Sequence, residues 1–443
     1  MINVLLKAPI LSKSGYGEHA RFVYRSLKQR PDVFDVFVVA TEWGQSSWLL
    51  NETNEVNQIN LDITRTSKFI SDNTHNSVEK PIFDISLQVT IPNEFEISAR
   101  SNIGVTAGIE TDRVSAEWIQ KVNTMQGLIV VSKHAKEGFN KTSYDATRGD
   151  GGEKFLLKTT VPIDVVGYPT KTFEEKSLTG LGITTKFNFL TICQWGPRKN
   201  VAATVRGFIE EFKNDADVGL VIKTHRMNNS LSDRWSLKSE IFDILNQYPG
   251  RKCKIYYLHG NMTEQELHGL YTHPDIHAYV TTTHGEGYGL PIFEAAYSGM
   301  PVIAPAWSGH VDFLYMPRDT KSKKNLREAM FEKVKYELAP VSQEAVWDTV
   351  IGADAQWCYI DAKSFAKSMR KVKDSYIAKK RTAERLQTHL SETHSQEIMY
   401  KKIQDSVLRH HNNNLGNIIK NLEKGVTNHI CNSLATNSVK ETK

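Results

Sequence analysis

Residues 284–299 read His-Gly-Glu-Gly-Tyr-Gly-Leu-Pro-Ile-Phe-Glu-Ala-Ala-Tyr-Ser-Gly, and this stretch decides the fold. The apolar run Ile276–Thr281 before it predicts a short buried strand. Pro291 suits the first position of a helix, where no backbone N–H is needed. Gly299 predicts the end of that helix, and Val302–Ala304 predicts the next strand. The stretch therefore predicts a strand, loop, helix and strand in succession, as in an α/β domain.

Two carboxylates stand eight positions apart in this unit, Glu286 on the loop and Glu294 in the expected first turn of the helix. Parallel α/β sheets bind their ligands at the carboxyl ends of the strands, where this loop lies. Free amides and the dipole at a helix N-terminus favour an anion such as phosphate. Carboxylates accept strong hydrogen bonds from sugar hydroxyls. A site that offers both favours a nucleotide sugar as ligand.

Together with Pro-Val-Ile-Ala-Pro-Ala-Trp-Ser-Gly-His-Val-Asp-Phe-Leu at 301–314, the stretch resembles the Glu-x7-Glu segment of family 4 glycosyltransferases. Two glutamates at this spacing are usually two solvated acids, and the Gly-Tyr-Gly-Leu-Pro between them carries the resemblance. The resemblance implies the α/β GT-B fold, in which two Rossmann-like parallel-sheet domains enclose a cleft. It implies that Glu294 holds the ribose hydroxyls and Glu286 orients the sugar. The loop residues that would contact the donor are Gly287, Tyr288, Gly289 and Leu290.

Apolar runs typical of strands alternate with longer helical patterns twice along the chain, which predicts two parallel sheets with crossover helices. The expected strands are Val4–Leu6, Phe34–Ala40, Ile85–Val89, Gly104–Gly108 and Gly127–Ser132, then Phe187–Gln194, Val218–Thr224, Lys254–Leu258, Ile276–Thr281 and Val302–Ala304. Two polar segments, 51–80 and 140–156, are expected to be an exposed insertion and a flexible surface loop.

The expected domain organisation follows from these two series. We expect an acceptor-side Rossmann-like domain at 1–170, a linker at 171–186, a nucleotide-sugar-binding Rossmann-like domain at 187–365, C-terminal helices at 366–410 that partly return to the first domain, and a loosely ordered tail at 411–443.

Composition narrows the class of protein. The chain has 443 residues, 40% of them hydrophobic and 24% charged, as in ordinary globular proteins. Its net charge of +5 is too small to indicate nucleic-acid binding. No apolar run approaches ~20 residues, and the start is typical of a first strand and not of a signal peptide. The four cysteines are dispersed, which indicates neither zinc nor a disulfide framework and favours the cytoplasm.

A basic segment, Lys363–Arg385, carries much of the excess positive charge in a helix-like pattern. Its simplest interpretation is a solvated helix face. The alternative is peripheral contact with an anionic membrane, which would place the protein at the inner membrane surface.

The strand Phe187–Gln194 is followed by Trp-Gly-Pro-Arg-Lys-Asn and the helical run Val201–Phe212, which puts Arg198 and Lys199 on a loop between them. Two cations there can neutralise a diphosphate and stabilise it as a leaving group. The segment resembles the phosphate loop of the same family, although many members carry a further Arg where this chain has Cys193-Gln194. The resemblance therefore leaves Lys199, helped by Arg198, as the main diphosphate contact.

Lys223 lies at the carboxyl end of the next expected strand, Val218–Thr224, and it is either a second phosphate contact or a plain strand-end lysine.

In the first domain, Gly15 and Gly17 precede a helix and permit close backbone approach to a phosphate. The run Gly15–Ala20 also matches G-x-G-x-x-A, which raises a dinucleotide-binding alternative. A dinucleotide-binding strand runs directly into its first glycine, whereas Ala8–Ser14 intervenes here. The run fits better the glycine-rich loop with which GT-B enzymes close over the donor.

The segment after Gly108 resembles the acceptor-side half of a subgroup of these enzymes and places Glu110 and Asp112 at the cleft. Many members carry a His near Glu110, so the catalytic residue of this domain stays open; His19 and His134 are further candidates that are more often structural. Asp215-Ala-Asp217 matches the metal-binding D-x-D, but it precedes a strand, so we expect a turn.

The family resemblance implies that the enzyme retains the anomeric configuration. Together with the residues above, it predicts a metal-independent glycosyltransferase of polysaccharide synthesis without a cofactor. It would move a hexose from GDP-mannose or a UDP-hexose to a hydroxyl of a glycan, a lipid-linked acceptor or a protein. The alternatives are an NAD-dependent oxidoreductase, a non-catalytic sugar-nucleotide binder, and a sugar-nucleotide epimerase on the same fold.

Overall fold

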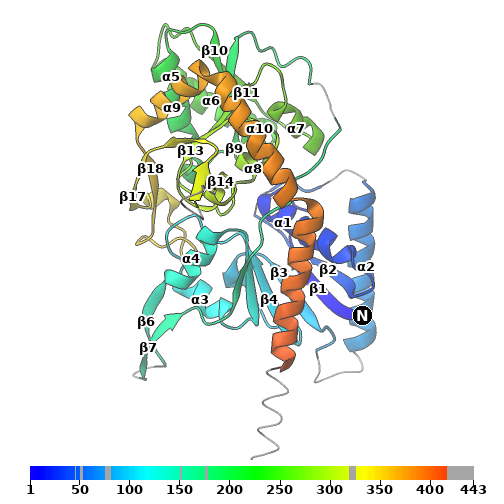
Figure 1. Cartoon of the computed structure of the whole chain (residues 1–443). Helices are drawn as coiled ribbons and strands as arrows, with labels where there is room; N and C mark the ends of the chain where they lie inside the picture. Colours follow the sequence, from blue (N-terminus) through cyan, green and yellow to red (C-terminus); the bar gives the residue numbers. More distant parts are fainter. Residues whose placement is uncertain are drawn as a thin grey trace, which may run out of the picture.

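The computed structural model describes residues 1–44, 46–49, 53–74, 81–149, 152–174, 178–318 and 326–416. Over these residues the chain forms two parallel six-stranded sheets, each flanked by helices, stacked one above the other in Figure 1. Sheet one is formed by the N-terminal part of the chain and sheet two by the part that follows it. This architecture is the pair of Rossmann-like domains that the sequence predicted.

Sheet one is entirely parallel and is built around β1 and β3. Its strands in spatial order are β2 (Phe34–Ala40), β1 (Ile2–Ala8), β3 (Ile85–Val89), β4 (Ser101–Thr106), β5 (Gly127–Val130) and β8 (Ile163–Val165). Its helices are α1 (Gly15–Lys28), α2 (Asn54–Thr74), η1 (Pro92–Glu94), α3 (Ala116–Val122) and α4 (Lys133–Lys141). The five strands expected in this half are all present, with ends that differ by a few residues.

Sheet two is parallel as well, with β9 at its centre. Its strands in spatial order are β11 (Lys254–Leu258), β10 (Val218–His225), β9 (Phe187–Gln194), β12 (Ala278–Val280), β13 (Val302–Pro305) and β16 (Glu332–Val334). Its helices are η2 (Pro197–Lys199), α5 (Val201–Phe212), α6 (Leu231–Asn246), α7 (Glu264–Tyr271), α8 (Leu290–Tyr297), η3 (Gly309–Asp312) and α9 (Ala362–Asp374). Residues 187–192 of β9 are buried, as in a strand covered on both faces.

Regular structure is present in both polar segments, the expected exposed insertion at 51–80 and the expected flexible loop at 140–156. In the segment expected to be an exposed insertion, α2 packs along the outer edge of the first domain (Figure 1), burying Val56 and Ile59. Thr66 on this helix accepts a hydrogen bond from the backbone of Val38, at 2.7 Å. The expected loop at 140–156 contains an antiparallel hairpin of β6 (Ser143–Thr147) and β7 (Lys154–Lys158). Both predictions were wrong because mostly polar elements can be held by a few buried side chains; residues 50–52, 75–80 and 150–151 lie outside the described residues.

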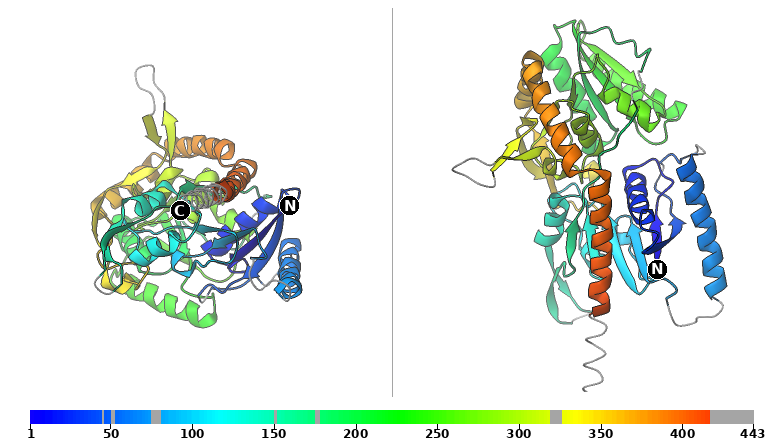
Figure 2. Two further views of the ribbon diagram at one scale, coloured as in Figure 1. Left: turned by 90° about the horizontal axis from the view of Figure 1, so that it is seen from below. Right: turned by 45° about the vertical axis from the view of Figure 1, so that its right-hand side comes forward.

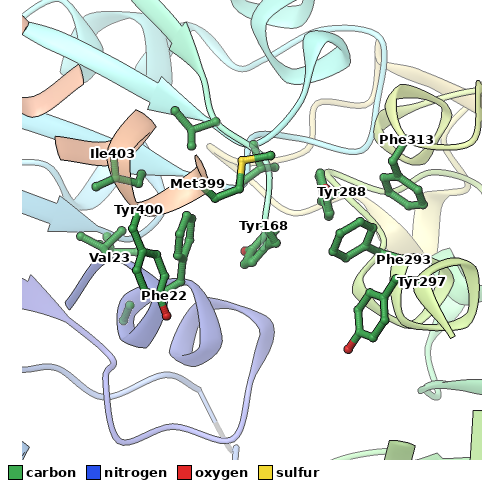
Figure 3. Close-up of a cluster of buried hydrophobic side chains, with 14 of the residues drawn as sticks. Phe22, Val23, Tyr168, Tyr288, Phe293, Tyr297, Phe313, Met399, Tyr400 and Ile403 are labelled. Carbon is green, nitrogen blue, oxygen red and sulfur yellow. The ribbon is translucent and has the colours of Figure 1, made fainter. Parts of the chain in front are cut away.

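A hydrophobic core joins the two domains across the seam between the sheets (Figure 3). The second domain supplies Tyr288, Phe293 and Tyr297 from α8 and the loop before it, and Phe313 from the end of η3. The first domain and the C-terminal helix supply Phe22, Val23, Tyr400 and Ile403. Tyr168 lies between the groups, with its ring centroid 5.0 Å from that of Tyr288. The domains are therefore held in contact by a shared apolar core.

The C-terminal helices cross this seam. Helix α10 (Tyr376–Thr393) packs on α8, where the Lys380 ammonium donates to the carbonyl of Gly299 at 2.7 Å. A further helix at 396–416 then runs along the first domain (Figure 2, right). Gln404 donates to the carbonyl of Ser26 at 2.7 Å, and Asn414 to that of Arg100 at 2.9 Å. Residues 411–416 thus belong to a docked helix where a loose tail was expected, and 417–443 lie outside the described residues.

The remaining strands form two short hairpins beside sheet two. They are β14 (Tyr315–Arg318) with β15 (Leu326–Ala329), and β17 (Tyr336–Pro340) with β18 (Gln356–Ile360); η4 (Gln343–Ala345) lies between β17 and β18.

The basic segment 363–385 falls on α9 and α10, and ion pairs within the molecule use several of its cations. Lys371 and Lys379 both bind Glu332, at 2.8 and 2.6 Å, and Arg370 binds Glu211 at 2.6 Å. Among the described helices, none is long and apolar enough to cross a membrane. Peripheral membrane contact stays a prediction.

Candidate functional site

Three of the predicted residues meet at the carboxyl edge of sheet two. Lys199 and Arg198 lie in η2, directly after β9, and Glu286 lies on the loop between β12 and α8. The Lys199 ammonium is 2.5 and 2.7 Å from the two carboxylate oxygens of Glu286, and the Arg198 guanidinium is 3.1 Å from Oε2. The hydroxyl of Thr283 donates to Oε1 at 2.9 Å. The structure therefore joins the two motifs in one buried cluster.

The charge of Glu286 is set by these neighbours. Its side chain is 8% exposed, and burial by itself would raise its pKa. The cations of Lys199 and Arg198 outweigh burial and lower the pKa of Glu286 from 4.5 to about 2. Glu286 is an anion at every physiological pH.

Backbone hydrogen bonds fix the two loops relative to each other. Asn200 adopts the left-handed conformation, with φ of 51°, and turns the chain from η2 into α5. Its carbonyl accepts from the hydroxyl of Thr282 at 2.9 Å, and the carbonyl of Arg198 accepts from the backbone of His284 at 2.8 Å. The hydroxyl of Ser308 accepts from the backbone N–H of Glu286 at 2.9 Å. The loops thus hold the charged side chains in position.

Arg198 also reaches the first domain. Its Nη2 is 3.2 Å from Oε1 of Glu110, which follows β4, while its Nη1 donates to the carbonyl of Gly285 at 2.9 Å. Burial alone would lower the pKa of Arg198, but the carboxylates of Glu110 and Glu286 raise it. The acceptor-side candidate Glu110 therefore belongs to the same cluster as the predicted phosphate contacts.

Gly285 and Gly287 are required because their loop lies in close contact with the first domain. A Cβ at Gly285 would collide with the carbonyl of Glu110, and one at Gly287 would lie 2.5 Å from the carbonyl of Ala107. The hydroxyl of Ser132 donates to the carbonyl of Gly287 at 2.6 Å. The glycines let the second domain press its backbone directly against the first, a reason that sequence pattern alone did not reveal.

Glu294 occupies a different environment. Helix α8 begins at Leu290 after Gly289, whose φ is 91°, so Glu294 lies in the second turn and not in the expected first. Its Oε2 accepts a hydrogen bond from the hydroxyl of Tyr271 at 2.9 Å. Burial raises the pKa of Glu294 from 4.5 to about 7, because Lys171 and Tyr271 only partly offset it. Near neutral pH this carboxyl is balanced between its neutral and charged forms.

Two other donor candidates have structural partners. The ring of Tyr288 lies in the interdomain core, so a donor contact from it would have to come from its backbone. Lys223 is buried at the end of β10, and its ammonium donates to the carbonyl of Gly260 at 2.8 Å. Burial lowers the pKa of Lys223. In the pairing of β10 with β9, Lys223 lies opposite Ile192, and the next residue, Thr224, lies opposite Cys193.

In the first domain, Gly15 and Gly17 form the start of α1 and not a separate loop. Ser14 caps this helix by accepting from the backbone of Gly17 at 3.1 Å. A Cβ at Gly17 would collide with the carbonyl of Ser12, whereas Gly15 has open space around it. Because residues 9–14 separate β1 from Gly15, the strand does not run into the glycine as a dinucleotide fingerprint requires.

The other acceptor-side candidates are held within the structure. Asp112 accepts from the backbone of Gln356 at 2.7 Å, which ties its loop to β18. His19 is fully buried without a hydrogen-bond partner, and burial lowers its pKa to about 3. His134 packs edge-on against Trp307 of the second domain, and burial lowers its pKa to about 4. Both histidines are neutral packing residues in this arrangement.

The D-x-D match lies at the amino end of β10, at the edge opposite to the cluster, as expected for a turn. Asp217 pairs with Lys186 at 2.9 Å and Asp215 with Lys373 at 3.5 Å. Across the described residues, no group of three or more His, Cys, Asp or Glu side chains is arranged to hold a metal ion.

Sequence reasoning missed Thr283, Ser308 and Tyr271 as partners of the two glutamates. Thr283 lies only three residues before Glu286, so the motif could have included it. Tyr271 ends α7 and Ser308 precedes η3, and neither position carries a signal in the sequence.

Comparison with known proteins supports the fold and adds one partial sequence match. No protein-family model matches the chain. A segment of 116 residues is 29% identical to the serotype-specific mannosyltransferase WbdA of Escherichia coli. The match spans 26% of this chain but only 13% of that protein.

Solved structures of low sequence identity match almost the whole chain. Sucrose-phosphate synthase from Thermosynechococcus elongatus has a TM-score of 0.57 at 9% identity, over 92% of this chain and 99% of that one. The Escherichia coli trehalose-6-phosphate structure bound with UDP-2-fluoro glucose has a TM-score of 0.54 at 9% identity, over the same shares. TarM has a TM-score of 0.53 at 11% identity, over 93% and 99%. The chain therefore has the predicted GT-B fold.

Proposed function

We propose that this chain is a glycosyltransferase that transfers a hexose from a nucleoside-diphosphate sugar, GDP-mannose or a UDP-hexose, to a hydroxyl acceptor. The observation that carries the proposal is the cluster of Arg198, Lys199 and Glu286 at the carboxyl edge of sheet two, pressed against the first domain. The GT-B fold and the partial match to a mannosyltransferase support it. A glycan, a lipid-linked acceptor or a protein would receive the sugar.

The two cations would hold the diphosphate of the donor. Arg198 and Lys199 are already positioned by backbone contacts and by Glu286, so they need little rearrangement when charge develops on the leaving phosphate. Preorganised donors aimed at developing charge are usually the largest contribution to catalysis. We therefore assign leaving-group stabilisation to Lys199, helped by Arg198.

The two glutamates would bind the two sugars of the donor. Glu294, on α8, would accept hydrogen bonds from the ribose hydroxyls, which requires its charged form. Glu286, anionic and beside the cations, would orient the transferred hexose next to the diphosphate. Lys223 would add a contact to the donor near its base or its phosphates.

The reaction we propose retains the anomeric configuration and needs no metal. The acceptor oxygen bonds to the anomeric carbon on the face from which the phosphate oxygen leaves, and that phosphate oxygen takes the acceptor proton. This scheme suits the site, because the candidate bases of the first domain are already engaged. Glu110 is paired with Arg198, and His19 and His134 are buried and neutral. The charge of the leaving group, spread onto Arg198 and Lys199, replaces a separate protein base.

Thermal-shift measurements with a panel of ligands test the proposal. UDP, GDP, UDP-glucose, GDP-mannose and NADH would each be added to the full chain. A ligand at ~100 times its Kd stabilises the fold by roughly 2.7 kcal/mol. We expect stabilisation by one nucleotide-sugar class; stabilisation by NADH alone would favour the oxidoreductase instead.

Two variants and an activity assay complete the test. Lys199→Ala should reduce the stabilisation, whereas Lys186→Ala should keep it, because Lys186 is an exposed lysine paired with Asp217 away from the cluster. Release of the nucleoside diphosphate from the identified donor, with acceptor or by slow hydrolysis, distinguishes an enzyme from a non-catalytic binder. Ligand binding without any turnover would contradict the enzyme.

A further inference from the structure

Arg198 lies between two carboxylates that belong to different domains. Glu286 of the second domain binds Nη1 at 3.1 Å, and Glu110 of the first domain lies 3.2 Å from Nη2. Lys199 binds Glu286 as well. Two cations and two carboxylates thus form a group with no net charge, and a diphosphate that enters it competes with the carboxylates for the same cations.

The two carboxylates are not equally easy to displace. Glu286 is 8% exposed and is held by Lys199 through both oxygens and by the hydroxyl of Thr283. Glu110 is 23% exposed, and its carboxylate pairs with Arg198 over one distance of 3.2 Å. Glu110 is therefore the partner that a phosphate would replace at Arg198.

Glu110 cannot move far after it is displaced. Its carbonyl is in close contact with Gly285, and Asp112, two residues later, exchanges two hydrogen bonds with the backbone of Gln356 at 2.7 and 3.0 Å. These contacts hold the loop against the second domain while the domains stay closed. The displaced carboxylate would then face the bound diphosphate across a short distance, and like charges in such a site repel.

We propose that Glu110 is a positioning residue that controls release of the nucleoside diphosphate, by competing with it for Arg198 and repelling it once the sugar has left. This inference rests on the proposed function and assigns a role within the same site. Glu110 acts through its ion pair with Arg198. Because Glu110 comes from the first domain, its repulsion is relieved when the nucleotide leaves or when the domains part.

The experiment measures nucleotide affinity in the Glu110→Gln variant. Isothermal titration of UDP and GDP into the wild type identifies which diphosphate binds, and the same titration is repeated on the variant. We expect that diphosphate to bind roughly tenfold more tightly to the variant, because a like charge is removed while the side-chain shape is kept. Glu110→Ala should tighten binding in the same direction, since the effect requires only loss of the charge.

Two controls separate charge from structural disturbance. The matching nucleoside, uridine or guanosine, should bind wild type and variant alike, because it carries no phosphate. Glu137→Gln removes an exposed carboxylate of the first domain that is paired with Lys141 and not with Arg198, so diphosphate affinity should stay within twofold. In turnover assays Glu110→Gln should lower the donor KM and kcat together, because product leaves more slowly.

The outcomes distinguish the two proposals. Wild-type protein that binds neither UDP nor GDP would overturn the proposed function itself. Wild type that binds a diphosphate, with a variant that binds it equally or more weakly, would overturn only the role of Glu110. Equal tightening of diphosphate and nucleoside would overturn that role as well, because the effect would not depend on phosphate charge.

Discussion

The two ends of the segment 286–294 carry the same residue in opposite electrostatic states. Glu286, on the loop, lies among Lys199, Arg198 and a hydroxyl, and its pKa is lowered to about 2. Glu294, on α8, has the hydroxyl of Tyr271 as its hydrogen-bond partner, and burial raises its pKa to about 7. Burial acts on both carboxyls, and the nearness of cations decides the outcome.

This difference indicates two kinds of work. A permanently charged carboxylate can hold cations and a sugar in place through a reaction without changing its own state. A carboxyl near its pKa accepts strong, charge-assisted hydrogen bonds from hydroxyl groups only when it has lost its proton. Under the proposed function, the segment would combine a fixed anion beside the reacting bond with a titrating contact at the other end of the donor.

The largest expected effect comes from removing the ammonium of Lys199, which pairs with Glu286. Lys199→Ala should lower kcat by a factor of about 10²–10³, the usual cost of losing one preorganised electrostatic donor. Acceptor KM should change little. Steady-state kinetics with the identified donor measure this, and a kcat within twofold of wild type would dismiss Lys199 as the leaving-group stabiliser.

Replacing each glutamate tests whether the two ends act at different stages. Glu286→Gln should lower kcat roughly tenfold or more with donor KM little changed, because its contact strengthens as the sugar ring gains positive charge. Glu294→Gln should raise donor KM and spare most of kcat, because the ribose is bound equally in ground and transition states. Wild-type kinetics in both variants would show that the segment is not the donor site.

The pH dependence of donor binding sharpens the contrast. Because the carboxyl of Glu294 loses its proton near pH 7, donor KM in the wild type should fall about tenfold between pH 6 and pH 8. Glu294→Gln should remove this dependence, whereas Glu286→Gln should keep it, since Glu286 is charged throughout. A flat donor KM profile in the wild type would contradict the assignment of Glu294 as a titrating contact.

Stability should change with opposite sign in the two variants. The raised pKa of Glu294 means that the folded chain loses free energy of unfolding as pH rises from 4.5 to 7, so Glu294→Gln should be more stable at pH 8 by about 1–3 kcal/mol. The lowered pKa of Glu286 contributes stability above pH 4.5 that is lost as pH falls toward 2, so Glu286→Gln should be less stable at pH 8.

Urea unfolding of both ligand-free variants at pH 8 and pH 5 measures these shifts. The gain in Glu294→Gln should shrink at pH 5, close to the ordinary pKa of a glutamate. Shifts of the same sign in both variants would show that the two environments differ less than the structure indicates.

The smallest expected effect concerns metal. We expect transfer to stay within twofold in excess EDTA, because two lysines already bind the aspartates of Asp215-Ala-Asp217 at the far edge of sheet two. Asp217→Asn should likewise leave kcat unchanged. Loss of activity on chelation that manganese restores would make a metal part of the site.

Most of the fold could be predicted because its strands are apolar runs bounded by turn residues. The ranges Phe34–Ala40, Ile85–Val89, Phe187–Gln194 and Lys254–Leu258 are the same in sequence and structure. The errors fall on α2, the hairpin of β6 and β7, and residues 411–416, where polar residues outnumber apolar ones. A few buried side chains and hydrogen bonds to distant residues hold these elements, and local pattern does not record them.

The order of strands and helices along the chain is enough to place Arg198, Lys199 and Glu286 on loops at the same edge of a parallel sheet. Which partners these residues meet depends on the tertiary structure. It brought Glu110 from the other domain onto Arg198, made Gly285 and Gly287 necessary for contact between the domains, and gave Glu294 a tyrosine instead of a cation. Charge state and close approach depend on distances between residues far apart in the chain, and only folding sets those distances.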